Sequence, residues 1–100
     1  MILVVGHVPV KPEKRDAMRQ AVQQVVAPTR AEAGCIIYDF YESISEPYLI
    51  HIYEEWESAE ALAAHLQQPH TQDFLAKLPE LAAGPATVKK FVIASEEVLL

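Results

Sequence analysis

Four glutamates, a tryptophan and two histidines lie close together in the stretch YEEWESAEALAAHLQQPH, residues 53–70. Histidine is the natural general base at neutral pH, because its ordinary pKa is about 6.5. The indole of Trp56 offers a flat apolar wall and one N–H donor. His65 is therefore the candidate base or proton relay, and Glu54 is a carboxylate that could orient its imidazole. We take these three residues as the candidate catalytic set.

The same residues also allow a purely structural interpretation. Trp56 could complete the core at the end of a strand, and His65 could be a buried helix histidine with satisfied partners. Glu54 could pair with Lys89 or Lys90 on the last strand. The combination of residues, more than any one of them, favours a functional site.

The sequence does not favour metal catalysis. His65 and His70 are five residues apart, a spacing that does not place two side chains on one face of a helix. No cysteine or further histidine lies near them to complete a ligand set. A glycine-rich phosphate loop and a serine-nucleophile motif are also absent. We therefore expect no metal ligands.

Hydrophobic periodicity and turn residues predict the elements that position these side chains. Strands are expected over Ile2–Val10, Cys35–Glu42, Tyr48–Trp56 and Thr87–Ala94. Helices are expected from Pro12 to a kink or end at Pro28, from an N-cap at Ser58 to Gln67, and from Pro69 to a break at Pro79. Residues 43–47 form the turn of a hairpin, and Gly34 can supply a left-handed helix stop.

The predicted order is β-α-β-β-α-β, which is the ferredoxin-like arrangement of an α+β protein with both helices on one face of an antiparallel sheet. We expect one domain over residues 1–100. The third strand presents two different faces, Ile50, Ile52, Glu54 and Trp56 on one and Leu49, His51, Tyr53 and Glu55 on the other. Because both faces carry apolar residues, a second copy is expected to cover the face that the helices leave bare, which gives a homodimer.

Composition limits the classes of partner. Hydrophobic residues make up 51% of the chain and the formal charge is −6, which argues against nucleic acid and anionic membranes. No apolar run approaches the roughly 18 residues of a membrane span, and MILVVGHVPV lacks the basic flank and cleavage site of a signal peptide. A single cysteine excludes an internal disulfide and fits a reducing compartment. The sequence therefore predicts a cytoplasmic protein.

The segments GCIIYDFYE, IYEEWES, EALAAH and PH resemble the antibiotic biosynthesis monooxygenase family, in particular its small quinol monooxygenase members. The resemblance spans nearly the whole chain and is most specific at Glu54-x-Trp56, Ala61, His65 and Pro69-His70. It implies a dimeric α+β barrel with an apolar cavity between the sheet and the helices. It also implies catalysis without metal or flavin, since characterised relatives oxygenate anthrone-like or quinol substrates in this way.

The function that this resemblance implies is a cofactor-independent monooxygenase whose partners are a small aromatic or quinol-like substrate, such as a quinol or polycyclic phenol, and dioxygen. Such a reaction needs a base, a dry apolar cage and hydrogen-bond donors for the developing anion. The expected substrate-binding residues are Tyr38, Ile52, Leu62, His70 and Phe74.

Two further functions stay open. The chain could be an isomerase or lyase acting on a small oxygenated metabolite, with His65 and Glu54 moving protons, or a non-catalytic dimer that binds an apolar ligand. Relatives that oxygenate anthrones or cleave haem use a pocket asparagine, whereas this chain contains none. Haem degradation is therefore disfavoured.

Overall fold

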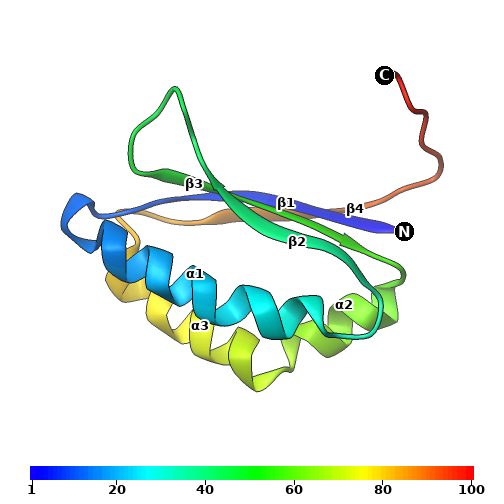
Figure 1. Cartoon of the computed structure of the whole chain (residues 1–100), viewed down its shortest axis with the longest axis horizontal. Helices are drawn as coiled ribbons and strands as arrows, with labels where there is room; N and C mark the ends of the chain where they lie inside the picture. Colours follow the sequence, from blue (N-terminus) through cyan, green and yellow to red (C-terminus); the bar gives the residue numbers. More distant parts are fainter.

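One antiparallel sheet, covered by helices on a single side, forms the body of the protein (Figure 1). A computed structural model describes all 100 residues. The elements in order are β1 (Ile2–Pro9), the 3-10 turn η1 (Pro12–Lys14), α1 (Arg15–Arg30), β2 (Cys35–Glu42), β3 (Leu49–Trp56), α2 (Ala59–Leu66), α3 (Pro69–Leu81) and β4 (Thr87–Val92). The predicted ferredoxin-like order is confirmed, with the second helical segment divided into α2 and α3.

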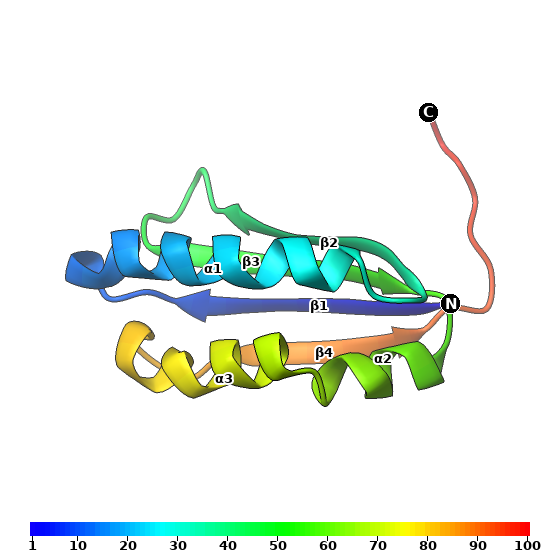
Figure 2. The same ribbon diagram turned by 60° about the horizontal axis from the view of Figure 1, so that its bottom comes forward.

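The strands lie in the order β2-β3-β1-β4, and every neighbouring pair is antiparallel. Helix α1 packs against β2 and α3. Figure 2 shows α1 running along the β2 and β3 side, while α2 and α3 follow the β4 side. None of the helices is long and apolar enough to cross a membrane.

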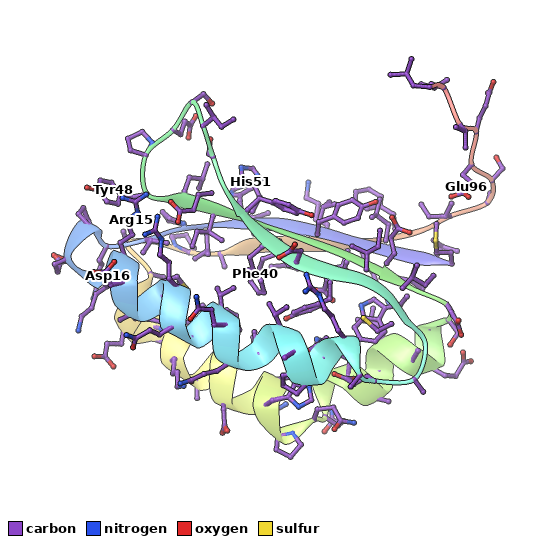
Figure 3. The ribbon with its side chains drawn as sticks, viewed as in Figure 1. Arg15, Asp16, Phe40, Tyr48, His51 and Glu96 are labelled. Atoms are coloured by element: carbon purple, nitrogen blue, oxygen red, sulfur yellow. The ribbon has the colours of Figure 1, made fainter.

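The strand register decides which side chains face the helices. Glu54 of β3 lies between Tyr38 of β2 and Val4 of β1, and directly paired residues of antiparallel strands point to the same face. The predicted alternation of β3 is confirmed, because Ile50, Ile52, Glu54 and Trp56 are buried while the residues between them are half-buried or exposed. Figure 3 shows Phe40 between the sheet and the helices and His51 on the opposite side of the sheet.

The predicted helix ends at Pro28 and Pro79 are wrong. Pro28 and Pro79 lie inside α1 and α3, which continue to Arg30 and Leu81. A proline in the last turn removes one backbone hydrogen bond, and packing can offset that loss. Thr29 and Leu81 are buried just after the two prolines, so each final turn is anchored by its side chain.

Other boundaries agree closely with the sequence. Strand β2 has the predicted bounds, and Gly34 takes a left-handed φ of 83°. Strand β3 begins one residue late because Tyr48 has φ 60°, which belongs to a turn. Strand β1 ends at Pro9 and β4 at Val92, one and two residues earlier than the predicted ends at Val10 and Ala94.

Candidate active site

The site is built where β3 ends and α2 begins. The Ser58 hydroxyl accepts a hydrogen bond from the Ala61 amide at 3.1 Å, so the helix starts as soon as the strand has ended. This turn brings the last turn of α2 back beside the strand. His65 is only 2% exposed, and its ring lies against the Trp56 indole with the ring centroids 4.7 Å apart.

Glu54 and Trp56 form a buried pair on the helix-facing side of β3. The indole Nε1 of Trp56 donates to Oε1 of Glu54 at 2.8 Å. Burial raises the pKa of Glu54 and the Glu32 carboxylate raises it further, while the Trp56 hydrogen bond and the charge of His65 act in the opposite direction. Glu54 forms no ion pair with Lys89 or Lys90 of β4, so the predicted alternative of a structural salt bridge with a lysine is wrong.

Trp56 does not line a cavity, which corrects the prediction that it forms the wall of one. Its side chain is 0% exposed, and its single N–H is already used by Glu54. The ring packs within the core cluster of the protein, with His65 on one side. Trp56 therefore holds Glu54 in place and does not meet a ligand directly.

Glu32 is a site residue that the sequence did not indicate. It lies in the turn between α1 and β2, and its Oε2 is 2.9 Å from Nδ1 of His65 and 2.7 Å from Nε2 of His70. A carboxylate accepts hydrogen bonds, so neutral His65 carries its proton on Nδ1 and keeps a lone pair on Nε2. That Nε2 is 4.0 Å from Oε1 of Glu54. Glu32 therefore orients the candidate base.

The structure brings His65 and His70 together, although their spacing does not place them on one helical face. They are not on one helix, because the chain leaves α2 after Leu66 and starts α3 at Pro69. The two rings therefore converge on Glu32, with centroids 6.4 Å apart. The sequence predicted this break at Pro69, but the spacing argument considered only ligands on one helix and not two helices that converge on a third residue.

A cavity of about 270 Å³ lies between the sheet and helices α2 and α3. Both Glu54 and His65 line it, together with four of the predicted substrate-binding residues, Tyr38, Ile52, Leu62 and Phe74. Phe40, Val4 and Val8 were not predicted and add to its apolar wall. His70 is absent from this cavity, because it lies on the other side of Glu32 beside a smaller hollow of about 70 Å³.

Leu66, Leu75 and Val88, which also line the cavity, are exposed. On α2, Leu66 is 45% exposed, whereas its neighbour His65 is buried. The helix is turned so that His65 reaches Glu32 and the Thr71 hydroxyl, 3.2 Å from its Nδ1. These leucines, from α2 and α3, and Val88, from β4, mark the mouth of the cavity.

Burial raises the pKa values of two groups that line the cavity, Tyr38 and Glu54. Burial, and then the Glu54 charge, raise the pKa of Tyr38, which is therefore a neutral phenol at the wall. Twelve of the seventeen residues that line the cavity are hydrophobic, and the other five are Glu54, His65, Thr71, Lys89 and Lys90. An oriented imidazole beside an apolar cavity defines a small-molecule site on a ferredoxin-like α+β domain.

Comparison with known proteins agrees with this class. The family model described as Antibiotic biosynthesis monooxygenase matches residues 1–77, and the chain belongs to that family. It is 35% identical to "Putative monooxygenase YcnE" of Bacillus subtilis over 88% of this chain and 93% of that protein. It is 34% identical to "Putative monooxygenase Rv0793" of Mycobacterium tuberculosis over 87% of this chain and 85% of that protein.

Solved structures show the same fold. The structure of Rv0793 from Mycobacterium tuberculosis superposes with a TM-score of 0.89 at 31% identity, covering 97% of this chain and 98% of that one. An antibiotic biosynthesis monooxygenase candidate from Deinococcus radiodurans gives a TM-score of 0.93 at 23% identity, covering 100% and 99% of the two chains. At that identity the second likeness concerns the fold alone.

Proposed function

We propose that this protein is a cofactor-independent monooxygenase that oxidises a quinol with dioxygen. One observation carries the proposal: Glu32 fixes the proton of His65 on Nδ1, so that the Nε2 lone pair is available at the apolar cavity. Membership of the monooxygenase family supports the reaction class. The finer assignment, a quinol substrate, follows from the chemistry and size of the cavity.

The reaction begins when Nε2 of His65 takes a phenolic proton from the quinol. The electron-rich quinolate passes an electron to dioxygen, and the two radicals couple to form a C–O bond to the ring. The peroxide oxygen takes up the proton held by His65. Loss of the ring proton at that carbon then breaks the O–O bond, and hydroxide leaves as water. Quinol plus O₂ thus becomes hydroxyquinone plus water, with all electrons supplied by the substrate.

The size of the cavity favours small substrates. A dry cavity of about 150 Å³ in a protein core takes up benzene. The cavity here is about 270 Å³, which suits one ring or two fused rings and leaves little room for a three-ring anthrone. We therefore favour a one- or two-ring quinol over a polycyclic phenol.

A second copy of the chain belongs to the proposal. The face of the sheet that the helices leave bare carries Leu3, Val5 and Tyr53, all half-buried, and the exposed Tyr41 and Phe91. An apolar surface of this kind on a small domain is typical of a subunit interface. We propose a homodimer that joins these two sheet faces.

Oxygen uptake tests the function directly. The chain is mixed with one-, two- and three-ring quinols, and oxygen consumption and product mass are followed beside a protein-free control for autoxidation. The proposal expects fast uptake with one- or two-ring quinols and incorporation of one ¹⁸O atom from ¹⁸O₂ into the product. Thermal stabilisation by quinones without any product would instead indicate a non-catalytic binding protein.

A specific observation favours one alternative function. Glu54, whose pKa burial raises, lies 4.0 Å from Nε2 of His65, so an acid and a base face the same cavity. Such a pair can move a proton between two carbons of an oxygenated metabolite, which is isomerase chemistry. Turnover that continues unchanged in the absence of oxygen would favour this function over oxygenation.

A further inference from the structure

Glu32 is a buried carboxylate with an unusual set of partners. Its side chain is 10% exposed, and its ion-pair contacts are with two histidines and with no lysine or arginine. Taking a carboxylate out of water is costly unless a positive charge compensates it. Arg30, two residues before Glu32 in the chain, pairs instead with Asp39 and with the carbonyl of Tyr38. The positive charge that balances Glu32 must therefore come from the histidines or from a bound ion.

The donor atoms around Glu32 already have the spacing of a coordination site. Oε2 of Glu32, Nδ1 of His65 and Nε2 of His70 all lie within 4.8 Å of one another. The two nitrogen–oxygen distances are 2.9 and 2.7 Å. Adjacent ligands bound at about 2.1 Å from an octahedral ion are about 3.0 Å apart, so small side-chain movements would suffice.

The donors come from three separate and well-anchored segments. Glu32 lies in the turn before β2, His65 in the last turn of α2, and His70 in the first turn of α3. Only His70 is appreciably open to solvent, with its side chain 20% exposed, and it gives an ion a path of entry. The ends of three elements thus meet at one point, as in sites where a metal joins distant parts of a chain.

The surroundings also fit a metal-bound histidine. A ligating imidazole commonly donates its other N–H to a carboxylate, which fixes the ring. With an ion on Nδ1 of His65, the proton would move to Nε2, which faces Oε1 of Glu54 at 4.0 Å. The Thr71 hydroxyl, 3.2 Å from Nδ1, adds a neutral oxygen beside the donors.

We propose that Glu32, His65 and His70 form a binding site for one divalent transition-metal ion per chain. Two imidazoles and one carboxylate suit Zn²⁺, Co²⁺ or Ni²⁺ better than Ca²⁺ or Mg²⁺, which prefer all-oxygen ligand sets. The ion lies behind His65, on the side away from the substrate cavity, so it does not contact substrate. A bound ion inhibits the proposed reaction, because the proton of His65 then lies on Nε2 and this atom has no lone pair left to accept a substrate proton. This consequence depends on the proposed function.

Calorimetric titration of the untagged, chelator-treated chain with Zn²⁺ tests the site without any substrate. We expect one ion per chain, and Glu32→Gln and His70→Gln should each weaken binding by at least about tenfold. His7→Gln is the matched control, since His7 is an exposed histidine outside the cluster, and this variant should bind as the original chain does. Binding that is absent, or that His7→Gln weakens as much as His70→Gln, would overturn the proposal.

Spectroscopy keeps the test decisive if a variant fails to fold. Co²⁺ added to the unaltered chain should give visible absorption bands, which Zn²⁺ then removes by displacement. Imidazole NMR signals of His65 and His70 should shift with one equivalent of Zn²⁺, while those of His7 and His51 stay in place. Shifts confined to His7 and His51 would refute the site. Zn²⁺ binding without inhibition of turnover would leave the site standing and count against His65 as the base.

Discussion

The two halves of the helical layer differ, although both cover the same sheet. Helix α1 packs its buried residues Met18, Ala21 and Val25 into a solid core, and it runs against β2 and α3. Helices α2 and α3 leave a cavity of about 270 Å³ between themselves and the sheet, and residues of all four strands line it. One half is therefore packed closely, whereas the other leaves the space that the proposed substrate would occupy.

The difference begins in the sequence. Helix α1 is uninterrupted for 16 residues, and its buried positions recur at helical spacing. The corresponding segment on the other side is divided at residues 67–68, and all six residues of β4 are exposed. The break that weakens packing is the same feature that brings His65 and His70 to Glu32. The less solid half therefore carries the candidate site.

The largest expected effect is on turnover and concerns the candidate base, His65. It lies in the half of the molecule that contains the cavity, called the hollow half below, whereas the half that contains α1 is called the solid half. His65→Ala should lower quinol turnover by about 10²- to 10⁴-fold, because no other side chain at the cavity has an imidazole lone pair. His51→Gln, on the opposite face of the sheet, should retain turnover. Steady-state oxygen uptake of both variants measures the ratio. Full activity of His65→Ala would show that the base has been assigned to the wrong residue.

The second expectation contrasts stability in the two halves. Met18→Ala, at a fully buried position of α1, should lower the free energy of unfolding by about 2 to 5 kcal/mol. Leu75→Ala, at a position 44% exposed at the cavity mouth, should change it by less than about 1 kcal/mol. Leu75→Ala should alter KM instead, since it widens the mouth. Urea unfolding of both variants gives the comparison, and equal losses would contradict a solid and a hollow half.

Local patterns were enough to predict the fold. The alternation of β3, the N-cap at Ser58 and the left-handed Gly34 all express short-range rules that do not depend on distant contacts. The proline predictions failed for the opposite reason. Thr29 and Leu81 anchor the last turns through tertiary packing, which local rules do not contain.

The candidate site was predictable only in part. Glu54 and His65 were identified because they lie in one short stretch, and the structure brings both to the cavity. Glu32 lies 33 residues before His65, and an acidic residue in a turn is ordinarily solvated, so no local pattern marks it. Trp56 was misplaced because an indole at a strand end can face a cavity or fill the core. Only the packing around it decides which.

The third expectation tests the corrected position of Trp56. Trp56→Phe removes the N–H that Glu54 accepts, which should cost about 1 to 3 kcal/mol of stability because a buried carboxyl loses its partner. KM for a quinol should stay nearly constant, since Trp56 does not line the cavity, while kcat falls. Denaturant unfolding and the separate kinetic constants check this. A large rise in KM with unchanged stability would place the indole at the ligand after all.

The smallest expected effect is on the stability of the solid half and on how that stability depends on pH. Arg19 and Arg15 of α1 hold Glu42 of β2 at 2.6 and 2.7 Å, and these bonds lower the pKa of Glu42 to about 2. Because the folded pKa lies below the ordinary value of about 4.3, the pairs stabilise the fold above that pH, and this stability is lost as pH falls toward 2. Glu42→Gln should therefore lower Tm slightly at pH 6 and not at pH 2.

This pH effect should also be small and sensitive to salt, because all three side chains are substantially exposed. Glu46→Gln is the matched control, since Glu46 lies exposed in the turn between β2 and β3 and makes no ion pair. A Tm difference for Glu42→Gln that persists unchanged to pH 2 would mean that the Glu42 side chain stabilises the contact between α1 and β2 by packing and not by charge. The Glu42 pairs would then add no charge-based stability between α1 and β2, and the contrast with the polar candidate site beside α2 and α3 would become sharper.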